Sequence, residues 1–460
     1  MIKIQSKITP TLIRASVVSA LGGLLFGFDT AVIAGATGAI KELMALSGLE
    51  LGFAVSSALI GTILGTMLFA KPGEMFGCRP ILKLLAMLFF VSALGSALAW
   101  DYWSLVAFRF IGGLGVGGAS VFGPVYVAEL SPARLRGRLV LLFQYNVTVG
   151  ILIAFFSNAF IGTLGLDALH MEWRIMLGVG CLPALLFFVM LFTIPESPRW
   201  LVRKSRFVEA EDVLAMVGEQ DIPAEMADIK ASMHVGEGGS SERLFQKKYW
   251  YPIFLGMSVA ALGQLSFVNG FLYYLNDTLA EIGASFGGEF QPVIIGVANV
   301  LAATVALFTI DRFGRTAMLK IGSWGSAVPL ALCAYIAWTR TLIEWFPWSL
   351  AAFIFFFSFS QGAVVWVYIS EVFPNRVRAK GQSLGSFTVW IACALTAQIY
   401  PAIVEVGTCG LAIPFAIGCA IMVFQFFVVK YFFIETKGVS LEEMELLLKI
   451  EPTNKMERKI

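Results

Sequence analysis

The sequence predicts an all-α membrane protein whose twelve membrane-spanning helices form two six-helix bundles related by a parallel pseudo-repeat. Composition is the first reason. Of the 460 residues, 58% are hydrophobic and only 14% are charged, and the mean hydropathy is +0.80. In ordinary soluble domains about 45–50% of the residues are apolar and about 25% are charged. The other two reasons are twelve long apolar runs and a charged motif that occurs once in each half.

Each apolar run reaches the length of roughly 20 residues that a helix needs to cross about 30 Å of hydrocarbon. None of the runs alternates polar and apolar residues as the strands of a membrane barrel do, so we expect helices. The predicted spans are residues 11–36, 51–70, 81–100, 103–128, 139–163, 173–194, 251–275, 290–310, 318–339, 344–370, 383–404 and 411–434.

The lysines and arginines predict the orientation of these spans. If the N-terminus is inside, the outer loops hold only Lys41, Arg174 and Arg340, and most of the 33 basic residues fall on the inner side. The positive-inside rule favours this arrangement, which places both termini in the cytoplasm. The short loops and termini favour a bacterial inner membrane. A net charge of +2 gives no reason to expect a nucleic-acid partner.

One long polar stretch separates the first six spans from the last six. It begins with a helix-like segment, RFVEAEDVLAMVGEQ, and ends in a Gly/Ser-rich linker. We therefore predict four parts: an N-terminal six-helix bundle at 1–198, a cytoplasmic helical linker at 199–249, a C-terminal six-helix bundle at 250–436 and a cytoplasmic tail at 437–460.

The two halves repeat a charged motif at the inner ends of their helices. AELSPARLRGR and SEVFPNRVRAKG place Glu129 and Glu371 242 residues apart, and EMFGCR similarly matches DRFGR. A parallel duplication of six-span units is typical of two-bundle transporters. Ion pairs at helix ends can hold one conformation and separate in another, although such residues can also serve as topology signals alone. The predicted gate residues are Arg79, Glu129, Arg136, Asp311, Arg315, Glu371 and Arg378.

An ionisable residue, Asp29, lies inside the first predicted span, and Arg109 lies inside the fourth. A charged residue at membrane depth costs roughly 3 kcal/mol on insertion scales, so it is treated as functional by default. Burial favours the neutral acid, whereas a nearby guanidinium favours the carboxylate. We expect the two residues to pair, and changes in their separation to couple proton binding to conformation. The alternative is a static pair that only holds two helices together.

Gly113, Gly115 and Gly118 satisfy the G-x-G-x-x-G pattern of dinucleotide-binding proteins, but they lie within an apolar span with no strand before them. Gly113 and Gly117 also form GxxxG, which allows membrane helices to pack closely, and we interpret them in this way. No Walker A sequence occurs, and the two histidines are far apart. We therefore expect no cofactor and no metal, and a proton gradient as the energy source.

Uncharged amides and aromatic residues recur within the spans. Amides both donate to and accept from hydroxyl groups, and tryptophan faces suit the apolar side of a sugar ring. Amides can equally join helices, and tryptophans can mark the membrane interface. The candidate solute-binding residues are Gln144, Gln264, Asn269, Tyr273, Asn299, Trp366 and Trp390.

Over nearly its whole length the chain resembles the sugar porter family of the major facilitator superfamily. The matching segments are GGLLFGFDTAVIAGA, RFIGGLGVGGAS, PVYVAELSPARLRGRL, PESPRWL, QLSFVNGFLYY, DRFGRT, WVYISEVFPNRVRAKGQS and ETKGVSLEEME. The resemblance implies alternating access by two bundles, with Asp29 as the proton-linked acid and Arg109 as its partner. It adds Phe26 to the candidate solute-binding residues and Glu196, in PESPRWL, to the gate.

The chain departs from the family pattern at several positions. Gly263-Gln264 replaces a pair of glutamines, so one sugar-binding amide is missing, and Phe267 stands where glycine is usual. Val389 and Cys393 flank Trp390 where polar residues are common. A smaller or less hydroxylated solute than a hexose fits these changes.

The sequence therefore predicts a monomeric symporter of a monosaccharide and a proton, working in a lipid bilayer. A uniporter, or a carrier of another polyol or small organic solute, is the first alternative. A sugar sensor that does not transport is the second, and its class usually has longer cytoplasmic extensions. We expect no enzyme, because no nucleophile–base pair is apparent.

Overall fold

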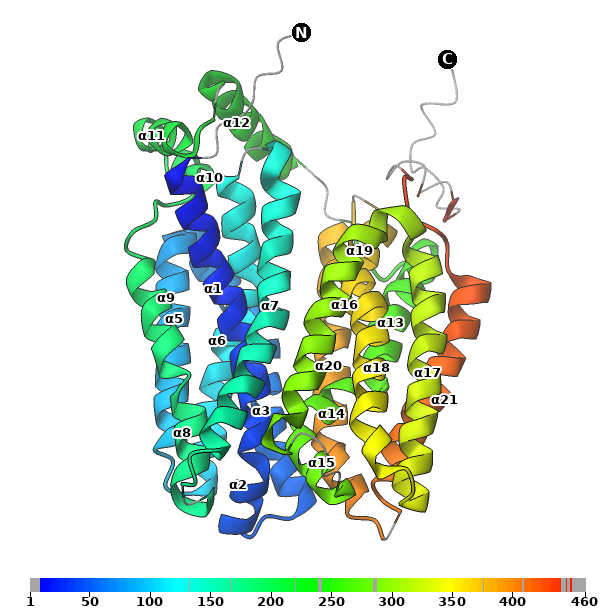
Figure 1. The fold of residues 1–460 in the computed structure, drawn as a ribbon. Helices are drawn as coiled ribbons and strands as arrows, with labels where there is room; N and C mark the ends of the chain where they lie inside the picture. The colour runs from blue at the N-terminus through cyan, green and yellow to red at the C-terminus, as the bar shows by residue number, and fades with distance from the viewer. Residues whose placement is uncertain are drawn as a thin grey trace.

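The computed structural model describes residues 9–131, 133–166, 168–219, 221–238, 242–283, 288–374, 376–407, 409–439, 444 and 447–448. Every regular element in this part of the chain is a helix. Two groups of long helices lie side by side, the first drawn in blue to green and the second in green to red (Figure 1).

The first group is built by α1 (Pro10–Val32), η1 (Ile33–Gly35), α2 (Thr37–Leu43), α3 (Gly48–Leu68), α4 (Ala70–Phe76), α5 (Cys78–Ala97), α6 (Tyr102–Leu130), α7 (Ala133–Gly162), η2 (Ala168–Glu172), α8 (Trp173–Gly178) and α9 (Cys181–Met190). Three shorter helices follow it: α10 (Pro198–Arg203), α11 (Phe207–Val217) and α12 (Ile222–Gly238). The second group is built by η3 (Lys247–Tyr249), α13 (Trp250–Leu265), α14 (Val268–Tyr273), α15 (Leu275–Ile282), η4 (Gly288–Phe290), α16 (Gln291–Phe313), α17 (Arg315–Thr339), η5 (Ile343–Trp345), α18 (Phe346–Phe357), η6 (Ser358–Gly362), α19 (Ala363–Val372), α20 (Arg378–Val404) and α21 (Ala412–Phe432).

Twelve helical stretches in the described residues are long and apolar enough to cross a membrane, and each overlaps one predicted span. Many large apolar side chains on them are exposed, such as Leu182, Phe308 and Val328. Exposed apolar surface on this scale suits contact with hydrocarbon rather than water. The predicted fold, a twelve-span protein of two six-helix bundles, is confirmed.

Close backbone contact joins α3 to α6, and glycines make it possible. A Cβ atom added to Gly113 would lie 1.9 Å from the carbonyl oxygen of Ala58, and one added to Gly117 would lie 2.2 Å from that of Thr62. Any larger residue would push the helices apart. The packing interpretation of the glycine motif is therefore confirmed.

Several predicted spans are not single continuous helices, and two of these lie in the second half. The span at 251–275 breaks between α13 and α14, where Phe267 has a φ of 65°. Such a left-handed conformation is uncommon for a bulky residue and tends to occur at functional sites. The span at 344–370 contains the π-helical turn η6 between α18 and α19. Turns of this type also concentrate at functional sites.

Several polar contacts between the two halves lie at the end of the molecule that carries α2 and α15 (Figure 1). Ser56 on α3 donates to the side chain of Gln398 on α20 at 2.6 Å, and Gln398 donates to the carbonyl oxygen of Leu49 at 2.9 Å. Lys41 forms an ion pair of 2.8 Å with Glu405. Helices α10–α12 lie at the opposite end, beside the start of α1 (Figure 1).

Candidate functional site

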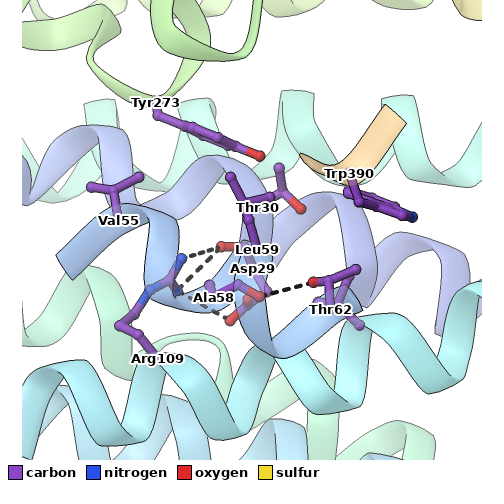
Figure 2. A pocket seen from close by; sticks show the side chains of 10 residues that line it. Asp29, Thr30, Val55, Ala58, Leu59, Thr62, Arg109, Tyr273 and Trp390 are labelled. Atoms are coloured by element: carbon purple, nitrogen blue, oxygen red, sulfur yellow. Dashed lines mark hydrogen bonds and ion pairs between the residues drawn. The ribbon is translucent and has the colours of Figure 1, made fainter. Parts of the chain in front are cut away.

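Asp29 and Arg109 meet in the interior of the first half, between α1 and α6. Nη1 of Arg109 lies 3.4 Å from Oδ1 of Asp29, and the same guanidinium faces the backbone carbonyl of Asp29 at 3.4 and 3.5 Å (Figure 2). The two side chains are only 4% and 13% exposed. Beside the pair, Gly112 packs closely against Ser92, because a Cβ there would lie 2.3 Å from the hydroxyl oxygen of Ser92. The predicted pairing of these two residues is confirmed.

This pair lines a small pocket to which both halves of the chain contribute. Thr30, Val55, Ala58, Leu59, Thr62 and Val116 come from the first half, and Tyr273 and Trp390 come from the second. Figure 2 shows Tyr273 and Trp390 on the opposite side of the pocket from Arg109. A rearrangement between the halves therefore changes the surroundings of the carboxylate directly.

Aromatic side chains of the two halves also meet beside the pocket. The rings of Phe26 on α1 and Trp390 on α20 have centroids 5.9 Å apart and are tilted by 41°. The hydroxyl of Tyr273 lies 3.9 Å from the sulfur of Cys393, which is one turn from Trp390 along α20. Three of the predicted solute-binding residues, Phe26, Tyr273 and Trp390, therefore meet in one place.

The predicted amides on the second half are paired with polar neighbours. Asn269 on α14 donates to the side chain of Gln264 on α13, so this hydrogen bond spans the break at Phe267. Asn299 on α16 is buried and accepts from the hydroxyl of Ser358 at 2.7 Å. A hydroxylated ligand would have to exchange these bonds for its own.

The remaining two candidates stand apart from this group. Trp366 on α19 is 38% exposed. Gln144 on α7 is exposed as well. Among the described contacts, none joins either residue to Asp29, Gln264 or Asn299. Their assignment stays a prediction.

The gate residues of the first half form bonds within that half. The backbone N–H of Arg79 donates to Glu196 at 3.2 Å, and its guanidinium donates to the carbonyls of Leu191 and Phe192 at 2.9 Å each. Burial raises the pKa of Glu196, although backbone donors oppose the shift. Glu129 accepts from the thiol of Cys78 at 3.7 Å. The side chain of Arg136 lies outside the described residues.

In the second half, Arg315 and Glu371 form a two-point ion pair, with Nη2–Oε1 and Nε–Oε2 distances of 2.9 and 3.1 Å. Both residues belong to the predicted gate. The Nε and Nη2 atoms of Arg378, another gate residue, are buried and have no hydrogen-bond partner in the described part of the chain. The side chain of Asp311 lies outside the described residues.

Two residues of this network were missed by the reasoning from sequence. Glu435 accepts from the backbone N–H groups of Arg315 and Thr316 at 2.8 and 3.0 Å, and the hydroxyl of Thr436 donates to Glu371 at 2.5 Å. Both belong to the ETKGVSLEEME segment, which carried the family resemblance but suggested no partner. No group of three or more metal-ligating side chains occurs in the described residues.

A family model described as sugar (and other) transporter matches residues 15–448. The D-xylose transporter of Levilactobacillus brevis is 36% identical over 439 residues, which cover 94% of each chain. The D-xylose-proton symporter of Escherichia coli K12 is 33% identical over 471 aligned residues, again covering 94% of each. The inward-open structure of the xylose transporter from E. coli covers 95% of this chain and 99% of its own, with a TM-score of 0.84 at 32% identity. These similarities confirm the resemblance seen in the sequence: the chain belongs to the sugar porter family of the major facilitator superfamily, a family of transporters and not of enzymes.

Proposed function

We propose that the protein transports a monosaccharide together with a proton by alternating access, and that Asp29 carries the proton. The observation that carries this proposal is the buried Asp29–Arg109 pair in a pocket lined by both halves. Two relatives described as a D-xylose transporter and a D-xylose-proton symporter support the choice of solute and ion.

The proton step follows from the surroundings of Asp29. Burial penalises the charged carboxylate, and the guanidinium of Arg109 offsets that penalty while it stays near. Closing or opening the pocket changes both the burial of Asp29 and its interaction with Arg109, because Tyr273 and Trp390 come from the other half. Asp29 therefore takes up a proton in one conformation and releases it in the other.

The solute step uses the same junction between halves. Phe26 and Trp390 offer apolar faces to a sugar ring, and Gln264, Asn269 and Asn299 offer amides to its hydroxyl groups. Gln144 and Trp366 complete this set when the halves close around the solute. Binding that spans the junction favours closure, so occupancy of the site promotes the change of access.

The conformation described here corresponds to a carrier open toward the end with α10–α12. The bonds of Ser56 with Gln398 and of Lys41 with Glu405 hold the halves together at the other end. In contrast, the bonds of Arg79 and Arg315 stay within their own halves. The likeness to an inward-open xylose transporter agrees with this assignment.

We place the protein in the inner membrane of a bacterial cell. Its α10–α12 end faces the cytoplasm, because the basic residues gather at that end. The two bundles, 1–198 and 250–436, move as units around the site, and the linker at 199–249 joins them. One monomer contains both halves of the pocket, so no second copy is needed for transport. The predicted tail at 437–460 lies mostly outside the described residues.

Uptake into proteoliposomes tests this function. With an inward proton gradient, the wild-type protein accumulates D-xylose above its equilibrium level. Asp29→Asn loses this accumulation but still exchanges labelled for unlabelled sugar. Asp101→Asn is the matched control, because Asp101 only caps α6 at the surface and asparagine caps equally well. Unchanged accumulation by Asp29→Asn would disprove the coupling. If the wild type only equilibrates D-xylose across the membrane, whatever the proton gradient, it is a uniporter.

A further inference from the structure

Gln361 is a buried glutamine whose amide has no hydrogen-bond partner. The residue is 2% exposed, and neither its Nε2 nor its Oε1 forms a bond in the described part of the chain. A glutamine amide can donate twice and accept twice. Buried polar groups in native proteins are nearly always satisfied, so the amide of Gln361 is free to pair with a ligand if its position brings the two together.

The position of Gln361 lies in the irregular turn of the second half. It belongs to η6 (Ser358–Gly362), the π-helical turn between α18 and α19. Neighbouring residues fix this turn on two sides. Ser358 donates to Asn299 on α16 at 2.7 Å, and Ser360 packs so tightly on α17 that a Cβ at Gly322 would lie 1.7 Å from its hydroxyl oxygen. The turn is therefore anchored beside a candidate solute-binding amide.

The third side of η6 faces α13 at Gly263. A Cβ atom added to Gly263 would lie 3.2 Å from Oε1 of Gln361 and 3.6 Å from its amide carbon. The amide of Gln361 thus occupies the space that a side chain at position 263 would need. Gln264, whose amide pairs with Asn269 across the helix break, is the next residue along α13.

We propose that Gln361 is a solute-binding residue that determines specificity, and that its amide provides the hydroxyl contacts which Gly263 cannot make. The inference rests on the proposed function, because it requires a hydroxylated solute to bind beside Gln264 and Asn299. The glutamine side chain has three rotatable bonds, and no side chain at Gly263 blocks its path toward Gln264. When the halves close on the solute, Nε2 donates to one sugar oxygen and Oε1 accepts from a hydroxyl.

Binding of D-xylose to the purified full-length protein tests this assignment. Gln361→Leu keeps the volume and loses the amide, so we expect its affinity for D-xylose to fall about tenfold or more. Gln425→Leu is the matched control. Gln425 on α21 is 1% exposed and also lacks amide partners among the described residues, but it lies on a different helix from the candidate site. Its variant should bind D-xylose as the wild type does.

Moving the amide between helices provides the sharper test. Gly263→Gln alone should weaken binding, because its new side chain meets the Gln361 amide. The double variant Gly263→Gln/Gln361→Ala should recover affinity to within about threefold of the wild type. Gln361→Asn withdraws the amide by one methylene and should give an intermediate loss of D-xylose affinity. This variant replaces Gln361→Leu as the test if Gln361→Leu folds poorly.

Monodeoxy analogues of xylose identify the hydroxyl group involved. In the wild type, the analogue that lacks this hydroxyl should bind more weakly than D-xylose. In Gln361→Leu, that analogue and D-xylose should bind with equal affinity. Wild-type affinity and unchanged analogue preference in Gln361→Leu and Gln361→Asn would overturn the inference and leave the proposed function intact. Failure of the wild type to bind D-xylose, D-glucose or L-arabinose would contradict the proposed function and this inference together.

Discussion

Lys41 and Glu405 connect the two halves of the chain: Nζ of Lys41 lies 2.8 Å from Oε1 of Glu405, whose other oxygen accepts from the backbone N–H of Gly48 at 3.0 Å. The pair is about 40% exposed on each side chain, so water screens it. A few residues along α20, Gln398 joins Ser56, which is only 1% exposed. The two contacts therefore differ in how strongly they hold the α2–α15 end closed.

Gln398→Leu is expected to open this end. It removes the side-chain acceptor of the buried Ser56 hydroxyl, a cost of about 1–2 kcal/mol, or roughly fivefold to thirtyfold in the ratio of open to closed forms. Distances between spin labels on α3 and α20 measure this population. Glu405→Gln is the comparison and should shift it less than about fivefold. A larger shift for Glu405→Gln than for Gln398→Leu would contradict this ranking.

Asp277 makes the closure of the same end depend on pH. It lies on α15, just past the predicted span, against α2, where a Cβ at Gly38 would lie 2.8 Å from its Oδ1. Burial raises the pKa of Asp277 to about 6 from 3.8, although a hydrogen bond from Thr37 and the charge of Lys41 oppose the shift. The closed form therefore binds a proton more tightly than an open form in which the group is hydrated.

Closure is thus favoured below about pH 4 and loses this contribution as pH rises through 6. The ratio of closed to open forms should fall by about 30-fold between pH 4 and pH 6 in the same spin-label measurement. Asp277→Asn should remove this fall and leave only the weaker, opposite dependence of the exposed Lys41–Glu405 pair, which lowers the pKa of Glu405 in the closed form. Glu281→Gln removes a neighbouring exposed charge and should keep the dependence. A flat profile in the wild type would show that Asp277 is not buried on closure.

Gly113 and Gly115 lie two residues apart on α6 but should respond differently to the same change. Gly113→Ala places a Cβ 1.9 Å from a backbone oxygen of α3 and should destabilise the protein by about 1–3 kcal/mol. At Gly115 the first contact is at 3.5 Å, an ordinary van der Waals distance, so Gly115→Ala should change stability by less than about 0.5 kcal/mol. Thermal unfolding in detergent measures both. Equal loss in the two variants would contradict the role of close helix packing.

Glu435 stabilises the start of α17, where the helix cap at Gly314 provides no side chain. Although burial opposes ionisation, bonds from Thr316, Arg315 and Lys437 lower the pKa of Glu435. Glu435→Ala should therefore cost about 1–2 kcal/mol at pH 7, and this difference should shrink as pH falls below the ordinary glutamate value of 4.5. Glu209→Ala, which removes an exposed pair with Arg206, should have little effect. Melting temperatures measured from pH 7 down to about pH 3 test the comparison.

The sequence was sufficient to predict the spans and the Asp29–Arg109 pair. Length and hydropathy determine which segments enter a membrane, and a lone acid at that depth requires a partner. Hydropathy does not encode where an apolar helix bends, so the breaks at Phe267 and at Ser358–Gly362 were not foreseen.

Side-chain partners were harder to predict for a different reason. The repeated motif placed Glu371 and Arg378 close in sequence, but tertiary packing gave Glu371 to Arg315, 56 residues away. Gln361 was not among the amides selected from the sequence, although Gln144 and Gln264 were. What distinguishes Gln361 from a glutamine that joins helices is that its amide lies beside Gly263, which has no side chain.

The central claim is that Asp29 carries the coupled proton, and sugar-induced proton movement tests it most directly. D-xylose is added to de-energised vesicles in a weakly buffered medium, and a pH electrode records the outside. The account predicts a transient rise in external pH for the wild type and none for Asp29→Asn, with downhill sugar entry retained in both. A rise of equal size in Asp29→Asn would contradict it, because the proton would then enter on another group.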